Sequence, residues 1–161
     1  MNYDLAWEWH WKSIDVNLKV TTTAAEVFLA HRQSTNENEK GGQLFIDTSM
    51  SNGLWLSLAT PPHMDDRAGP TWLELDSNRC KQEIIEYKEK GLILVGYWHT
   101  HAELRPNLSV QDLKSFQEFS CKNNESLPSP LAIIVGNSTK NESIRAWSLQ
   151  KNDFLLATLV R

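Results

Sequence analysis

The sequence predicts an α/β or α+β fold: a central mixed β-sheet flanked by about three helices, in a single domain over residues 1–161. Three observations support this. Short apolar runs alternate with stretches that carry helix caps and helical spacing, without a regular strand–helix–strand repeat. The length of 161 residues is that of one domain, and such a domain buries roughly 70% of its unfolded surface. No internal repeat or low-complexity segment suggests a second domain.

The N-terminal part predicts strands followed by a helix. Apolar and polar residues alternate over residues 5–20, which places Trp7, Trp9 and Trp11 on one face. Aromatic side chains bury large areas, so a core or edge-covering role is favoured over a ligand platform. The threonines at 21–23 offer N-caps for the helix. Its inner face would carry Ala24, Val27, Phe28 and either Ala30 or His31.

The middle of the chain is expected to form two strands, a loop and a helix. Prolines bracket residues 61–70 and Gly69 interrupts them, which predicts a long irregular loop of a kind that is often functional. Ser77 or Asn78 would cap the helix, and Gly91 would end it. The first expected strand is 43–46, directly after Gly41-Gly42, and the second is 54–59. The loop follows, and after it a helix that runs to about Lys90.

The C-terminal half predicts a buried strand, a third helix and further strands. Residues 92–98 are a short, strongly apolar run, as in a strand buried on both faces. Ser109 opens a helix that carries Leu113, Phe116 and Phe119. The other expected elements are a loop at 100–108 and strands at 131–136, 143–149 and 154–160.

Composition excludes several classes of protein. The net charge of −4 comes with no cluster of lysine or arginine, which argues against nucleic-acid binding. No run of about 18 apolar residues predicts a membrane span, and the polar N-terminus does not resemble a signal peptide. Cys80 and Cys121 have no CxxC partner, which favours reduced or buried thiols. We therefore expect a cytoplasmic protein.

Two histidines stand at the end of the predicted buried strand. Residues i and i+2 of a strand share a face, so His99 and His101 can converge on one zinc ion. A catalytic zinc takes three protein ligands and leaves one position for water. Asp112, in the first turn of the following helix, is the natural third ligand. The remaining histidines are isolated in the sequence: His10, His31 and His63.

Each half of this segment also has a structural interpretation. Histidines one residue apart are often surface or structural residues. Ser109-Val110-Gln111-Asp112 is a capping box with aspartate in place of glutamate. The combination favours a site, because the tip of a buried strand is an unusual place for two unneeded polar side chains.

The spacing His99-x-His101, seven residues, Ser109-x-x-Asp112 resembles the JAMM motif of the JAB/MPN metalloprotease family, whose domain is cytidine deaminase-like. Glu39-Lys40-Gly41-Gly42 fits the glutamate that this family places upstream, and the likeness spans roughly residues 20 to 135. One bacterial branch, found in integrative and conjugative elements and in antiphage (CBASS) operons, is similar at further positions. These are Arg32-Gln33, Asp65-Asp66-Arg67, Thr71-Trp72 and Gly96 to His101.

The resemblance implies roles for five residues. His99, His101 and Asp112 would bind one zinc ion per chain. Glu39 would act as the general base, and is preferred to Glu37 because the paired glycines follow it. The Ser109 hydroxyl would stabilise the oxyanion and cap its helix as well.

One residue departs from the family pattern. The family usually has a proline after the second histidine, and this chain has Ala102. Proline restricts φ and stiffens the chain. We therefore expect a looser loop at 102–108, with zinc binding retained.

The resemblance also implies a substrate. The family usually cleaves an isopeptide or peptide bond after the C-terminal tail of a ubiquitin-like protein, which binds by adding a strand to a sheet edge. The loops at 61–70 and 102–108 would flank that groove, where residues 65–67 are either a solvated loop or a binding element. The antiphage branch implies release of a conjugated nucleotidyltransferase, attached by E1- and E2-like enzymes. Two alternatives are a hydrolase for a sulfur carrier or small peptide, and a non-catalytic MPN scaffold.

Overall fold

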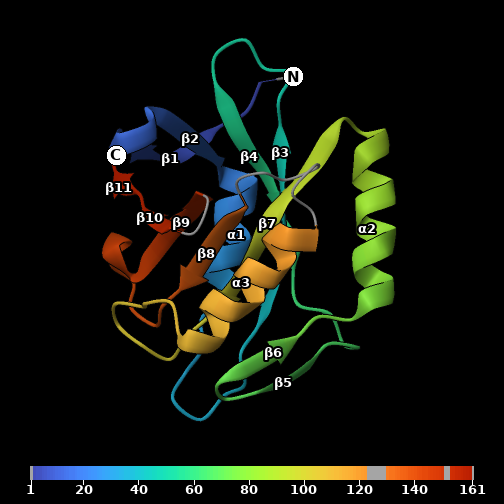
Figure 1. Cartoon of the computed structure of the whole chain (residues 1–161), viewed down its shortest axis with the longest axis vertical. Helices are drawn as coiled ribbons and strands as arrows, with labels where there is room; N and C mark the ends of the chain where they lie inside the picture. Colours follow the sequence, from blue (N-terminus) through green and yellow to red (C-terminus); the bar gives the residue numbers. More distant parts are fainter. Residues whose placement is uncertain (1, 123–129, 151–152, 161) are drawn as a thin grey trace.

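The computed structural model describes residues 2–122, 130–150 and 153–160. Within these ranges, nine strands form one sheet in the order β10-β9-β8-β7-β3-β4-β2-β1-β11, and β5 and β6 form a separate two-stranded ribbon (Figure 1). The sheet strands are β1 Leu5–Trp11, β2 Val16–Thr21, β3 Gly41–Asp47, β4 Leu54–Ala59, β7 Leu92–Thr100, β8 Leu131–Val135, β9 Ile144–Gln150, β10 Asp153–Leu156 and β11 Thr158–Leu159. The ribbon strands are β5 Arg67–Gly69 and β6 Trp72–Glu74, and the helices are α1 Thr22–Ala30, α2 Ser77–Glu89 and α3 Val110–Lys122.

The sheet is mixed, as expected. β7 runs parallel to β8, and β2 runs parallel to β4, while the other neighbouring strands are antiparallel. β7 therefore lies inside the sheet, hydrogen-bonded to β3 on one side and to β8 on the other. Figure 1 shows α3 crossing one face of this region and α2 standing beside it.

The N-terminal prediction is largely confirmed. Trp9 and Trp11 are buried in the main core and Trp7 packs against it, as the core interpretation required. Thr21 caps α1 by accepting a hydrogen bond from Ala24 N. The inner face differs in one respect: Ala25 is buried, whereas Ala30 is exposed. At about 100° per residue, Ala30 points away from the face that carries the buried residues.

The region 61–76 departs from the prediction at two points. Residues 61–70 are not irregular throughout, because β5 pairs with β6 in an antiparallel ribbon. In this ribbon Gly69 lies opposite Trp72, and Arg67 lies opposite Glu74. Pro70 lies between the two strands and so breaks neither of them. The cap of α2 is Asp76, whose carboxylate accepts a hydrogen bond from Arg79 N at 2.9 Å, and not Ser77 or Asn78.

Two C-terminal predictions are also corrected. β7 continues to Thr100, two residues beyond the predicted end, and its first half is only half-buried, with Ile93 46% exposed. The predicted strand at 154–160 is two strands. β10 pairs with β9, and β11 pairs with β1. These two consecutive short strands are therefore the two edge strands of the sheet, which must curl to bring its edges together.

The sheet has a core on each face. The larger core joins the N-terminal tryptophans and α1 to Trp98, and the smaller one joins α3 to β8 and β9 through Phe116, Ile134 and Trp147. Cys80 is a half-buried free thiol, as expected. The side chains of Phe119 and Cys121 lie outside the described residues. Among the described helices, none has the length and apolar character that a membrane crossing requires.

Candidate metal centre

Strand pairing brings Glu39 to the two histidines. Gly41 lies opposite His99 in the antiparallel β3–β7 ladder. The ladder extends past the end of β3, where Thr100 N donates to Lys40 O at 2.9 Å and Lys40 N donates to Thr100 Oγ1 at 3.0 Å. Glu39 therefore emerges beside His101, and its Oε1 lies 3.7 Å from His101 Nε2.

The first glycine after Glu39 allows a close approach of two other segments. A Cβ at Gly41 would lie 2.4 Å from Trp98 O and 2.6 Å from Cδ2 of Leu73, in the β5–β6 ribbon. Any larger residue would push the ribbon away from the sheet. The ribbon in turn holds the glutamate, because Glu39 N donates to Gly69 O at 2.9 Å.

Three predicted ligands meet at one point. The Nε2 atoms of His99 and His101 are 3.2 Å apart. The two carboxylate oxygens of Asp112 lie 3.1 Å from His99 Nε2 and 3.2 Å from His101 Nε2. Both histidines are 8% exposed, so their ring nitrogens are largely withdrawn from water.

These separations suit a metal ion. Neighbouring ligand atoms around a tetrahedral zinc, each about 2.0–2.1 Å from the metal, are about 3.3 Å apart. The two ring nitrogens are 3.2 Å apart, and the Asp112 oxygens lie at similar distances from them, Oδ1 at 3.1 Å from His99 and Oδ2 at 3.2 Å from His101. One oxygen of Glu39 and one nitrogen of each histidine also lie within 4.8 Å of one another. The donor set of two imidazoles and a carboxylate can therefore hold a divalent cation, with Glu39 next to it.

The electrostatics are those of a coupled acidic and basic cluster. Burial raises the pKa of Asp112, but hydrogen bonds with His101 and His99 outweigh it and hold that pKa far below the usual range. Burial lowers the pKa of His101, and the contacts with Asp112 reverse the shift to a net increase. Burial raises the pKa of Glu39, against the influence of His99 and His101. The site thus favours a charged Asp112 and a less acidic Glu39.

Ser109 and Asp112 form the reciprocal cap that the sequence predicted. Asp112 N donates to Ser109 Oγ at 3.0 Å, and Ser109 N donates to Asp112 Oδ2 at 2.9 Å. This cap fixes the aspartate carboxylate against the histidines. The hydroxyl accepts in this contact, which leaves its own hydrogen for another acceptor.

The segment 102–108 is fastened at several points, in contrast to the loose loop expected from Ala102. Asn137 N donates to Glu103 O at 2.8 Å, and the Arg145 guanidinium donates to Pro106 O and to Asn107 Oδ1. Pro106 is buried. The neighbouring elements thus supply the restraint that a proline at 102 would have supplied locally. Oε1 of Glu103 also lies 2.9 Å from His101 Nδ1, without hydrogen-bond geometry.

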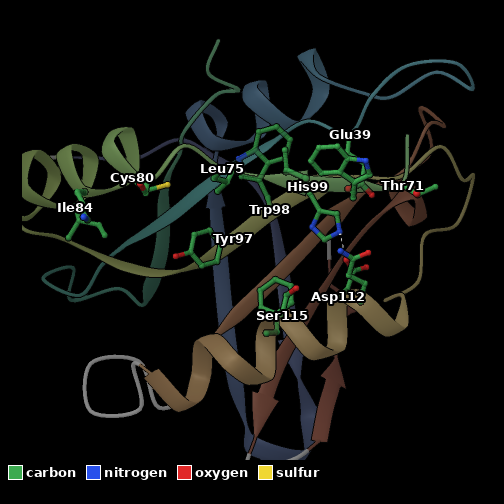
Figure 2. A pocket seen from close by; sticks show the side chains of 16 residues that line it. Glu39, Thr71, Leu75, Cys80, Ile84, Tyr97, Trp98, His99, Asp112 and Ser115 are labelled. Atoms are coloured by element: carbon green, nitrogen blue, oxygen red, sulfur yellow. Dashed lines mark ion pairs between the residues drawn. The ribbon is translucent and has the colours of Figure 1, made fainter. Parts of the chain in front are cut away.

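A pocket of about 470 Å³ opens beside this candidate metal centre (Figure 2). Its walls are β6 and the segment after it, α2, α3 and one face of β7. The predicted flanks at 61–70 and 102–108 contribute no lining residue, because Asp66 is drawn into a buried ion pair with Arg79 and segment 102–108 is fastened near β9. The sequence reasoning missed Tyr97, although it is two residues from His99 and so shares its face.

Comparisons with known proteins identify a family and a similar fold for the chain. Residues 21–150 match the model of a family described as prokaryotic homologs of the JAB domain. A search of curated proteins finds no match. Among solved structures, the chain is similar to the solution structure of protein DSY2949 from Desulfitobacterium hafniense, at 17% identity and a TM-score of 0.60. That alignment covers 85% of this chain and 87% of the other, and at this identity it supports the fold alone.

Proposed function

Because the chain belongs to the family of prokaryotic homologs of the JAB domain, we propose that it is a JAMM-type zinc peptidase. The observation that carries the proposal is the convergence of His99, His101 and Asp112, with three separations between 3.1 and 3.2 Å, and of Glu39 beside them. A scaffold without catalysis would need no such cluster of buried, mutually oriented polar groups.

In this mechanism His99, His101 and Asp112 would hold one zinc ion. A bound zinc ion would lower the pKa of water toward neutrality and supply Lewis-acid polarisation of the substrate carbonyl. Glu39 takes a proton from the attacking water at its carboxylate and delivers it to the leaving amine.

Ser109 would stabilise the charge that develops on the attacked carbonyl oxygen. Its hydroxyl is anchored by the bond from Asp112 N, and its hydrogen is free to donate. Removing one such donor typically raises the barrier by about 3 kcal/mol. We assign Glu39 and Ser109 as the catalytic residues.

We further propose that the bond cleaved follows the C-terminal tail of a ubiquitin-like conjugated protein. Within the described part of the chain, β6 pairs with β5 along one edge, and no strand pairs with its other edge. An extended tail can add to that edge next to the metal centre. The proposed setting is a cytoplasmic antiphage pathway in which E1- and E2-like enzymes attach a nucleotidyltransferase and this protein removes it. A sulfur carrier or small peptide is the alternative substrate.

Metal analysis and one pair of variants test the metal and the base. Zinc-reconstituted protein should contain one zinc per chain, measured by mass spectrometry of the metal. Glu39→Gln should keep the zinc and lose turnover of a ubiquitin-like fusion substrate by about 100-fold or more. Glu37→Gln is the matched control: Glu37 is tied to Ser34 N and Lys40 and should be dispensable. Absence of zinc, or full activity in Glu39→Gln, would contradict the proposal.

The substrate class is tested separately. The zinc-loaded protein is incubated with a ubiquitin-like fusion, with a thiocarboxylate sulfur carrier lacking a fused peptide, and with a nucleotidyltransferase conjugate. Hydrolysis of the thiocarboxylate carrier alone would contradict the isopeptidase assignment and favour a sulfur-carrier hydrolase. Cleavage of the fusion or the conjugate would retain it.

A further inference from the structure

The pocket beside the metal centre extends well past the reacting groups. In Figure 2, His99 and Asp112 lie at one end and Cys80 and Ile84 of α2 at the other, with Tyr97 between them. The two ends are joined by one continuous cavity of about 470 Å³. Ligand pockets usually measure about 300–1,000 Å³, so this volume is sufficient for a large side chain.

Away from His99 and Asp112 the pocket is lined mainly by apolar side chains. They include Leu75, Ile84 and Phe116. Burial raises the pKa of Tyr97 to about 12 and also raises the pKa of Cys80, so both groups are neutral near pH 7. The charged lining residue away from the metal end is Lys81, whose side chain is exposed. Such walls favour an apolar occupant.

The position of the ribbon indicates what kind of molecule brings that occupant. Thr71, Trp72, Leu73 and Leu75 all line the pocket, and the outer edge of β6 has no partner strand within the described residues. A peptide strand added to this edge would direct alternate side chains to one face of the strand. A peptide therefore suits the surroundings better than a lipid, which has no backbone groups to pair with the edge.

We propose that this pocket is a specificity subsite for one large apolar side chain, of leucine or phenylalanine type, close to the cleaved bond of a peptide substrate. The proposal rests on the proposed peptidase function. Residues Ile84, Tyr97 and Phe116 determine the specificity. A tail that presents only glycine near the cleaved bond would leave the pocket empty and bind weakly.

Binding tests this without depending on hydrolysis. The probes are fluorescein-labelled Gly-Gly-Xaa-Gly-Gly amides with Xaa as Leu or Gly, measured by anisotropy on the full chain with and without zinc. The leucine peptide should bind at least about tenfold more tightly, from the burial of one apolar side chain. In a Cys121→Ser background, the leucine peptide should also slow alkylation of Cys80 by iodoacetamide, and the glycine peptide should not.

Two neighbouring residues of α2 provide matched variants. Ile84 lines the pocket, whereas Ile85 is 63% exposed and is not among the lining residues. Ile84→Trp should reduce the preference for leucine to about threefold or less, while Ile85→Trp should leave it unchanged. Ser115→Trp fills the pocket from α3 and serves as a second variant if Ile84→Trp does not fold, as judged by circular dichroism.

The outcomes separate this proposal from the hydrolase assignment. Equal affinities for the two peptides, or a preference that survives in a folded pocket-filling variant, would overturn the subsite. Stronger protection of Cys80 by N-octanoylglycine amide than by the leucine peptide would identify an acyl-chain site and overturn it as well. Loss of zinc-dependent turnover with the leucine preference intact would overturn the hydrolase alone.

Discussion

Helices α1 and α2 both pack near the central strands, but they are held by different forces. α1 buries Ala24, Ala25 and Phe28 in the main core. α2, all of whose residues are described, buries a single side chain, and that residue is Arg79. The guanidinium of Arg79 donates to Asp66 at 2.7 Å, to Gly41 O at 3.0 Å and to Thr60 Oγ1 at 3.0 Å. α1 is held by buried apolar side chains, whereas α2 is held by the polar contacts of Arg79 near its start and by the ring contact of Tyr87 with Phe45 near its end, at 5.0 Å between centroids.

The two helices border different pockets. α1 and β1 line one of about 470 Å³, through residues that include Ala25, Leu29 and Trp7. α2 and α3 line the other, also of about 470 Å³, beside the two histidines. Tyr97 and Trp98 of β7 both line this second pocket, but only Trp98 is fully buried, where it packs on Phe28 of α1.

The largest effect is expected from truncation on the packed side. Trp98 is 0% exposed, packs on Phe28 with ring centroids 5.5 Å apart, and donates to Thr60 O at 2.8 Å. Trp98→Ala should lower the free energy of unfolding by about 3–5 kcal/mol. Ile84→Ala, on the pocket side, should cost about 1 kcal/mol or less, because Ile84 is only partly buried. Urea unfolding measures both, and equal losses would contradict the contrast.

Breaking the buried ion pair between Arg79 and Asp66 should lower stability nearly as much as Trp98→Ala. The Arg79–Asp66 and Arg67–Glu74 pairs both have N–O distances of 2.7 Å, but the first is buried and the second exposed. Asp66→Asn should destabilise the fold by about 3 kcal/mol, because it leaves a buried guanidinium without its full counter-charge. Glu74→Gln should leave stability nearly unchanged, because solvent screens an exposed pair. Similar costs for the two variants would show that the burial of Arg79 is unimportant.

Acid should weaken the anchor of α2 and spare the packing of α1. Burial raises the pKa of Asp66, but the hydrogen bonds from Arg79 and from the backbone N–H groups of Asp76 and His63 together outweigh it and hold that pKa below its ordinary value of 3.8. The stabilisation from this carboxylate is therefore full above about pH 4 and is lost as pH falls further toward the folded-state pKa. The difference in unfolding free energy between the wild type and Asp66→Asn should shrink below that pH. A constant difference down to pH 2 would contradict this linkage.

The smallest effects on stability are expected at two helix caps. Thr21 caps α1 and Ser109 caps α3, each through a hydroxyl that accepts a backbone N–H. Replacing either by alanine should cost about 1 kcal/mol of stability. Under the proposed mechanism only Ser109→Ala should also slow turnover, by about 100-fold or more, because of the two residues only Ser109 contacts a proposed metal ligand, Asp112. Equal turnover in the two variants would remove Ser109 from the mechanism.

The sequence predicted those elements whose signal lies within a few consecutive residues, such as a short apolar run or a helix cap. The strand at 54–59 has the predicted bounds, and Thr21 and Ser109 cap their helices as predicted. The β5–β6 ribbon escaped prediction because strand pairing depends on a partner, and Pro70 at the turn conceals two very short strands. The Asp76 cap was missed because Ser, Asn and Asp are all good caps and three of them are adjacent.

The shared face of His99 and His101 and the Ser109–Asp112 cap followed from the sequence, because residues at i and i+2 of a strand share a face and a capping box fixes the start of a helix. Only the tertiary structure brought Asp112 and Glu39 to the histidines and decided what surrounds them. The anchoring of Asp66 by Arg79, the docking of Leu73 against Gly41 and the pocket between α2 and α3 all join residues distant in the chain. No local pattern specifies such contacts, because they depend on how separate elements pack in space.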